Sequence, residues 1–166
     1  MSHRCPAVHC TLTIFAAVTL SATPPVSAQV QPAIDFTPVT DEMLQAPPPE
    51  HWLMWRRTLN SWGYSPLDQI DRSNVNELRM VWTRALNQGS NQGTPLVYDG
   101  VMYMPNPSDV IQAIDAVTGD LQWEHRRDQP EDLSDYVSGL AQINRNIAIH
   151  DTLIIDTSAD DYVFAL

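Results

Sequence analysis

The feature that most limits how this chain can fold is an internal repeat with an offset of 52 residues. At this offset, residues 95–104 align with residues 147–156 without a gap, and apolar positions fall on apolar positions almost throughout. Asp99 falls on Asp151 in the same alignment. Short strands that recur at a period of about fifty residues are typical of β-propeller blades, which bury their faces against neighbouring blades. The repeat therefore predicts an all-β protein built from successive, similar sheets.

A strand–turn–strand segment at residues 113–123 lies inside the first repeat unit. Asp115 is placed to accept hydrogen bonds from turn amides, and Gly119 can adopt the positive φ that closes such a turn. Leu121 and Trp123 then share one face of the outgoing strand. Taken alone, this segment is an ordinary hairpin that occurs in many β proteins. Its place in a repeat favours a propeller blade.

The flanking segments are expected to form short elements and polar connections. Alternating side chains over residues 80–83 predict a strand, and another strand is expected over residues 143–149. The polar segments 88–93 and 128–138 predict loops between strands. Residues 41–45 are expected to form one helical turn.

Five residues of the strand–turn–strand segment carry a family resemblance. They form the pattern Ala-x-Asp-x-x-Thr-Gly-x-x-x-Trp with Ala113, Asp115, Thr118, Gly119 and Trp123. This pattern resembles the tryptophan-docking motif of the pyrroloquinoline quinone (PQQ) dehydrogenases, and residues 64–82 and 94–103 resemble N-terminal signatures of the same family. The resemblance covers residues 51–166 and implies an eight-bladed β-propeller of the quinoprotein type. A propeller needs several blades to close its ring. This chain is expected to hold only about the first one and a half of them.

The sequence predicts three parts along the chain. Residues 1–28 resemble a secretory signal peptide, with Arg4 before an apolar run and small residues before a cleavage site after Ala28. The apolar run is too short to cross a bilayer and is followed by prolines, so a membrane-spanning helix is not expected. Residues 29–50 form a Pro-rich leader, and residues 51–166 form the truncated propeller. The protein is therefore expected to be periplasmic or secreted.

The charge balance of the chain limits its partners. The formal net charge is −11, and it becomes −12 once the predicted signal peptide is removed. This negative charge argues against binding to nucleic acid. The negative charge is explained either by a solvated acidic surface or by a docking surface for a basic electron-accepting protein. The resemblance implies that this electron acceptor is a cytochrome. All nine basic residues are arginines, which excludes a lysine nucleophile within this chain.

The resemblance implies two cofactor contacts in polar loops. Gln92, three residues before Pro95, stands where the family usually carries a glutamate that helps hold the quinone, and its amide can still hydrogen-bond a quinone carboxylate or carbonyl. Arg145 matches the arginine of the family's Asn-Arg pair, which contacts the quinone oxygens beside the catalytic calcium. A fixed cation there stabilises negative charge that develops on a quinone oxygen. Without the resemblance, an ion pair of Arg145 with a nearby acidic residue is the simpler interpretation.

Leu140 is the third candidate for a cofactor contact. Many alcohol-oxidising relatives carry a vicinal cysteine pair where this chain has Gly139 and Leu140, so the disulfide that covers one face of the quinone cannot form. Either the apolar side chain of Leu140 packs against the face of the quinone, or the site has lost its cofactor and the propeller serves as a scaffold.

Metal ligands and catalytic residues are expected outside this chain. His51, His125 and His150 lack the spacing of a metal site and are expected to be structural or at the surface. The resemblance implies that the calcium ligands and a catalytic aspartate lie beyond Leu166. No catalytic residue and no metal ligand is therefore predicted within this chain.

These observations favour one function and leave an alternative open. The resemblance implies a fragment of a periplasmic quinoprotein dehydrogenase that oxidises an alcohol or sugar hydroxyl by hydride transfer to PQQ, with calcium as a Lewis acid. The fragment alone is expected to be inactive. The alternative is a non-catalytic propeller with PQQ-type repeats that acts as a protein-interaction or assembly scaffold.

Overall fold

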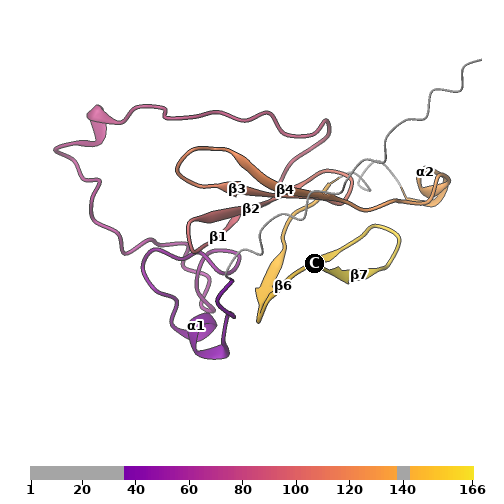
Figure 1. Cartoon of the computed structure of the whole chain (residues 1–166), viewed down its shortest axis with the longest axis horizontal. Coiled ribbons are helices and arrows are strands. Elements are labelled where there is room, and N and C mark those ends of the chain that lie inside the picture. Colours follow the sequence, from indigo (N-terminus) through magenta and orange to yellow (C-terminus); the bar gives the residue numbers. More distant parts are fainter. Residues whose placement is uncertain (1–35, 138–142) are drawn as a thin grey trace, which may run out of the picture. The chain divides into compact units, whose positions relative to one another are not determined.

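The two repeat units each form an antiparallel sheet in the computed structural model, which describes residues 36–137 and 143–166. The strands of the first sheet, in their spatial order, are β1 (Leu96–Tyr98), β2 (Val101–Asn106), β3 (Val110–Asp115) and β4 (Leu121–Arg126). Those of the second sheet are β5 (Ala148–His150), β6 (Leu153–Thr157) and β7 (Val163–Ala165). Each sheet is a meander in which consecutive strands are neighbours, as Figure 1 shows for the first sheet. The signal peptide predicted at residues 1–28 lies outside the described residues.

The strand register repeats with the offset found in the sequence. Tyr103 on β2 faces Ala113 on β3, and Ile155 on β6 faces Ala165 on β7. Each residue of the second pair lies 52 positions after its counterpart in the first. The prediction of successive, similar all-β sheets is therefore confirmed.

Aspartates at equivalent turn positions share an uncommon backbone conformation. Asp99 and Asp151 have φ values of 49° and 52°, and the next aligned pair, Asp109 and Asp161, has values of 54° and 67°. Aspartate tolerates this left-handed region better than most residues with a side chain. The aligned aspartates are therefore explained by the geometry of the turns that link the strands.

The turn between β3 and β4 forms as its sequence predicts. One carboxylate oxygen of Asp115 accepts hydrogen bonds from the backbone N–H groups of Val117 at 2.9 Å and Thr118 at 2.8 Å. Gly119 adopts a φ of 78°. The Trp123 ring, on β4, lies 6.0 Å from the ring of Tyr103 on β2 and packs beside the hydrophobic core.

Trp82 docks onto this same turn from an upstream segment. Its indole N–H donates a hydrogen bond of 3.2 Å to the carbonyl of Ala116, and a Cβ built on Gly119 would lie 2.7 Å from the indole ring. The strand predicted over residues 80–83 is absent, because no described backbone pairs with this segment. An extended segment becomes a strand only where a neighbour supplies its backbone hydrogen bonds. The side chain of Trp82 provides the attachment instead.

Residues 36–50, which the sequence assigns to the Pro-rich leader, pack onto the sheets. Val39 is buried and exchanges two backbone hydrogen bonds of 2.8 Å with Asp151. The helical turn α1 (Asp41–Gln45) follows as expected, with the Thr40 hydroxyl accepting from the N–H of Met43. The packed unit therefore begins before residue 51, and this segment joins the core with the buried residues Leu53, Leu96, Tyr98, Ile111, Ile149 and Ile154.

Among the described residues, the connections contain only short helical turns. The 3-10 turn η1 (Val75–Glu77) lies before Trp82, and α2 (Leu133–Tyr136) interrupts the connection predicted over residues 128–138. The strand predicted over residues 143–149 forms only at its end, in β5. In the described ranges, no helix has the length and apolar character required to cross a membrane.

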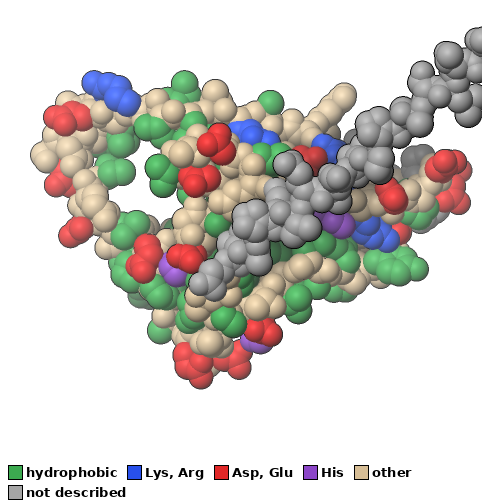
Figure 2. Space-filling view, viewed as in Figure 1, with side chains coloured by type: hydrophobic (Ala, Val, Ile, Leu, Met, Phe, Trp, Pro, Cys, Tyr) green, Lys and Arg blue, Asp and Glu red, His purple; other side chains and the backbone are tan. Residues whose placement is uncertain are grey.

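Many side chains between the leader and β1 are exposed although they are apolar. They include Trp55, Trp62, Tyr64, Leu67, Ile70, Leu78, Met80 and Val81. Three aromatic side chains of this segment, those of Trp55, Trp62 and Tyr64, are thus exposed within the described unit. Figure 2 shows acidic side chains at several separate places on one face of the molecule, with fewer basic ones.

Candidate functional site

Gln92 and Arg145, two of the predicted cofactor contacts, lie side by side although 53 residues separate them. The Nε of Arg145 donates a hydrogen bond of 3.2 Å to the side-chain oxygen of Gln92. The backbones are joined as well, because the N–H of Thr94 donates to the carbonyl of Arg145 at 3.1 Å. Gln92 precedes β1 and Arg145 precedes β5, so the repeat presents both residues at the same end of their sheets. We call these two residues the Gln92–Arg145 pair.

The loop that carries Gln92 is held tightly on the first sheet. The Asn91 side chain donates to the carbonyl of Pro105 at 3.0 Å and accepts from the N–H of Gly93 at 2.9 Å. A Cβ at Gly93 would lie 2.4 Å from the Pro105 ring, so only glycine allows this close approach. The backbone on both sides of Gln92 is thereby fixed, while the Gln92 side chain itself is exposed.

Arg145 carries a positive charge that no described carboxylate neutralises. Its side chain is exposed, and within residues 36–137 and 143–166 it forms no ion pair. The ion pairs of arginine in this part of the chain belong instead to Arg126 with Glu124 and to Arg127 with two aspartates. The simpler interpretation, in which an acidic residue pairs with Arg145, is thus not supported by the geometry.

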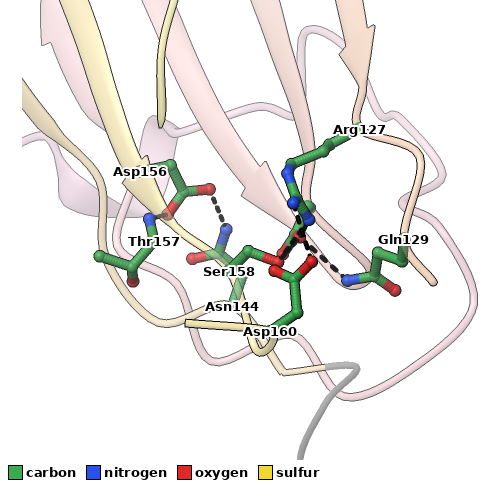
Figure 3. A network of polar contacts seen from close by, with 8 residues as sticks. Arg127, Gln129, Asn144, Asp156, Thr157, Ser158 and Asp160 are labelled. Atoms are coloured by element: carbon green, nitrogen blue, oxygen red, sulfur yellow. Dashed lines mark hydrogen bonds and ion pairs between the residues drawn. The ribbon is translucent and has the colours of Figure 1, made fainter. Parts of the chain in front are cut away.

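The residue before Arg145 is anchored in the interior. Asn144 is buried, and its side-chain amide donates a hydrogen bond of 2.6 Å to Asp156 on β6 (Figure 3). The second carboxylate oxygen of Asp156 accepts from the backbone N–H of Thr157 at 2.8 Å. Burial raises the pKa of Asp156 to about 6, and the nearby negative charge of Asp109 adds to this effect, while the two hydrogen bonds oppose it. Sequence reasoning did not single out Asp156.

A second polar cluster links the end of β4 to the turn between β6 and β7. Arg127 donates to Asp160 and to the Ser158 hydroxyl, both at 2.8 Å, and lies 3.5 Å from Asp109 (Figure 3). The Ser158 hydroxyl and the Gln129 amide also donate to Asp109. The pKa of Arg127 is raised mainly by its hydrogen bond to Asp160, and the same hydrogen bond lowers the pKa of Asp160. Every charge in this cluster is paired, which indicates a structural link between the two sheets.

A hollow of about 480 Å³ lies beside this cluster, and neither Gln92 nor Arg145 lines it. Its lining residues are Ser108, Val110, Arg126, Arg127, Asp128, Gln129 and Glu131. Both arginines in the lining already bind carboxylates. The hollow therefore offers no free cation for an anionic ligand.

The three described histidines make packing or surface contacts. The His51 ring lies 4.8 Å from that of Tyr98, the His125 ring lies 5.8 Å from that of Phe164, and the Nε2 of His150 lies 3.0 Å from a carboxylate oxygen of α1. The part of the chain that the structure describes contains no group of three or more His, Cys, Asp and Glu side chains that could hold a metal ion. Leu140, the third predicted cofactor contact, lies outside the described residues, as does Gly139.

A family model for the β-propeller domain of glucose, ethanol and alcohol dehydrogenases that use PQQ matches residues 52–166. The chain belongs to this family. The match covers both sheets and the loops that carry the Gln92–Arg145 pair.

Relatives and solved structures agree with this assignment. The chain is 43% identical over 88 residues to the dehydrogenase subunit of the quinone alcohol dehydrogenase of Gluconacetobacter polyoxogenes, and this match covers 52% of the chain and 12% of the relative. It is 31% identical over 115 residues to the quinohemoprotein alcohol dehydrogenase ADH-IIG of Pseudomonas putida, covering 69% of the chain and 16% of the relative. The solved structure of ADHIIG from Pseudomonas putida HK5 matches with a TM-score of 0.67 and 29% identity, over 78% of this chain and 19% of that one. The chain thus spans less than a fifth of the length of these proteins.

Proposed function

We propose that this chain is the N-terminal part of a periplasmic or secreted quinoprotein dehydrogenase that oxidises an alcohol or sugar hydroxyl by hydride transfer to PQQ. The contact between Gln92 and Arg145 carries the proposal, because it brings two predicted cofactor residues from successive repeat units to one place. Family membership supports the choice of cofactor. The names of the relatives, which are alcohol dehydrogenases, support the choice of substrate.

The Gln92–Arg145 pair fits an anionic group that is rich in hydrogen-bond acceptors. PQQ supplies the two-electron acceptor for the hydride when it is bound, and it carries carboxylates and quinone oxygens as acceptors. Arg145 contacts Gln92 only through its Nε, and its terminal guanidinium nitrogens form no hydrogen bond with a described protein acceptor. Because an arginine fork matches a carboxylate in geometry as well as charge, Arg145 would bind such a group in a defined orientation.

The amide of Gln92 changes the charge of the site relative to the glutamate that the family usually carries. A glutamate beside Arg145 would offset its positive charge, whereas an amide oxygen accepts the Nε–H without neutralising it. The amide nitrogen of Gln92 also remains as a donor. The pair in this chain would therefore attract an anionic cofactor through charge and hydrogen bonds from both residues.

The partners and metal of the whole protein belong to the same proposal. A basic cytochrome is the proposed electron acceptor, supported by the formal net charge of −11 and by the quinohemoprotein name of a relative. Calcium is proposed as the Lewis acid, with its ligands and the catalytic aspartate beyond Leu166. Leu140 is proposed to cover one face of the quinone.

A scaffold without catalytic activity is the second candidate. Two departures from the family's pattern favour it, namely the amide at Gln92 and the absence of a cysteine pair at Gly139 and Leu140. A scaffold needs neither a charged cofactor contact nor a free guanidinium. The hydrogen bond that places Arg145 beside Gln92, the other predicted cofactor contact, weighs against it.

Turnover of the complete protein tests the proposal. The purified apoprotein is reconstituted with PQQ and calcium, and dye reduction is followed with a panel of alcohols and sugars. Arg145→Ala is expected to lower kcat about 10- to 100-fold, since the lost contact strengthens as negative charge develops on the quinone oxygen. Gln92→Glu should retain activity.

Arg72→Ala is the matched control, because Arg72 is exposed and forms no described ion pair or hydrogen bond. It should leave turnover unchanged. Activity that is equally insensitive to Arg145→Ala would remove Arg145 from the site. A folded, quinone-loaded protein that oxidises none of the alcohols and sugars would favour the scaffold.

A further inference from the structure

Asp156 is a buried acidic residue at a position where the repeat carries an apolar one. The equivalent residue in the first unit is Met104, at the same place on β2. The Asp156 side chain is 2% exposed, and no described cation forms an ion pair with it. A buried carboxylate is costly unless its hydrogen bonds compensate for lost hydration. Its presence in this strand therefore requires an explanation beyond packing.

The hydrogen bonds of Asp156 lead directly to the Gln92–Arg145 pair. One carboxylate oxygen binds the Asn144 side chain, and the other binds a backbone N–H of its own strand. Asn144 is 7% exposed, so its side chain has little access to water as an alternative partner. Arg145 follows it in the chain, and its carbonyl accepts the hydrogen bond from Thr94. A continuous set of contacts thus runs from β6 to the loop of Gln92.

We propose that Asp156 is a positioning residue for the Gln92–Arg145 pair: it holds Asn144 in place and thereby directs Arg145 toward Gln92. This inference rests on the proposed function, because it assigns the orientation of Arg145 a role in quinone binding. Asp156 makes no contact with the exposed side chains of the pair and acts only through Asn144.

The residues around Asp156 explain why a carboxylate suits this role. An apolar side chain, as at Met104, cannot accept a hydrogen bond from Asn144, and the buried amide would then lose a partner. An Asn at position 156 keeps the shape but has one oxygen in place of two, while two donors point at it. The two oxygens of the Asp156 carboxyl accept one hydrogen bond each, so neither donor is left unpaired.

A double-mutant cycle on the complete protein tests the inference. PQQ binding is titrated for the wild type, Asp156→Asn, Arg145→Ala and the double variant. Asp156→Asn is expected to weaken binding about tenfold in the wild-type background and less than about twofold when Arg145 is already absent, because coupled residues are not additive. Asn144→Ala removes the same hydrogen bond from its other end and should give the same pattern.

Hydrogen exchange gives a readout that needs no quinone. The amide of Thr94 donates to Arg145, so it should exchange faster in Asp156→Asn than in the wild type. Asp151→Asn is the matched control, since Asp151 is an exposed aspartate on the same hairpin and asparagine tolerates its positive φ. This control should change neither quinone binding nor the exchange at Thr94.

Three results would overturn the inference. Equal weakening of quinone binding by Asp156→Asn with and without Arg145 would show a general structural effect. Unchanged exchange at Thr94 would show that Asp156 does not hold the loop. A folded wild-type protein that binds no quinone would remove the proposed function and the inference together, whereas the first two results leave the proposed function standing.

Discussion

At the scale of single residues, Gly119 satisfies two demands at once. It adopts a φ of 78°, and it leaves room for the Trp82 ring, which would lie 2.7 Å from an added Cβ. A side chain at this position would have to displace an aromatic ring and accept a strained backbone. The attachment of the upstream segment to the turn therefore depends on the absence of a side chain.

Gly119→Ala is expected to lower the free energy of unfolding by about 2–4 kcal/mol, from overpacking and backbone strain together. Gly100→Ala separates the two causes, because Gly100 has a similar φ of 75° but no atom within 4 Å of the added Cβ. It should cost only about 1 kcal/mol. Denaturant unfolding of both variants measures the difference, and equal losses would show that the Trp82 contact contributes little.

The raised pKa of Asp156 predicts a pH dependence of stability. Burial raises its pKa from the usual 3.8 of an aspartate to about 6 in the folded chain, so the folded state binds more protons between these pH values. This contribution to stability is therefore present below about pH 4 and is lost as the pH rises through about 6. The slope is at most about 1.4 kcal/mol per pH unit.

Asp156→Asn should remove this component, so the stability difference between variant and wild type should shift in the variant's favour as the pH rises from about 4 to 7. Unfolding free energies at a series of pH values measure it. Asp151→Asn serves again as the control for the lost charge. A stability difference that stays constant with pH would contradict the burial of an ionisable Asp156.

Some of these residue-level features were open to prediction from the sequence. The roles of Asp115 and Gly119 in the turn follow from local chemistry, and the structure confirms them. Asp156 was missed because its partner Asn144 is 12 residues away, and local patterns do not report such contacts. The available signal was the pairing of Asp156 with Met104 in the repeat, a mismatch that follows three aligned positions, 101–103 and 153–155, that are apolar in both units.

At the scale of elements, Arg127 ties the end of β4 to the turn between β6 and β7. The carboxylates of Asp109 and Asp160 are both nearly buried, and Arg127 is the only described cation that forms an ion pair with either of them. The Arg127 guanidinium also lies 5.0 Å from the centre of the Tyr162 ring, which adds a cation–π contact. One side chain thus joins elements from both repeat units.

Arg127→Met is expected to lower the free energy of unfolding by about 2–4 kcal/mol, because it leaves two buried carboxylates without a cation. Arg126→Met is the matched control: the neighbouring arginine is largely exposed, and its ion pair with Glu124 should contribute less than about 1 kcal/mol. Thermal or denaturant unfolding compares the two. Similar losses for both variants would show that Arg127 does not link the sheets energetically.

Strand boundaries were predicted less well than strand register. The repeat fixes which residues face each other, because a shift by one position would turn apolar side chains to the wrong face. Boundaries depend on partners: residues 80–83 alternate like a strand but have no described neighbour, and β5 begins only at Ala148, where Ile155 pairs with it. A sequence pattern shows what a segment can form, and the neighbours decide whether it does.

At the scale of the whole molecule, the repeat and the family motif together predicted the propeller fold, and the family match confirms it. The sequence did not reveal that residues 36–50 pack onto the sheets, since the contact of Val39 with Asp151 joins distant parts of the chain. The closeness of Gln92 and Arg145 was expected from the resemblance, and the structure shows their hydrogen bond. The cofactor itself remains the central proposal.

Calorimetric titration of PQQ into the folded, complete apoprotein in calcium-containing buffer tests that proposal most directly. We predict saturable binding of one quinone per protein, weakened about tenfold or more by Arg145→Ala and unchanged by Arg72→Ala, as expected for the loss of charge-assisted hydrogen bonds. Absence of quinone binding by the folded wild-type protein at every calcium concentration would contradict the account and leave the scaffold as the function of the propeller.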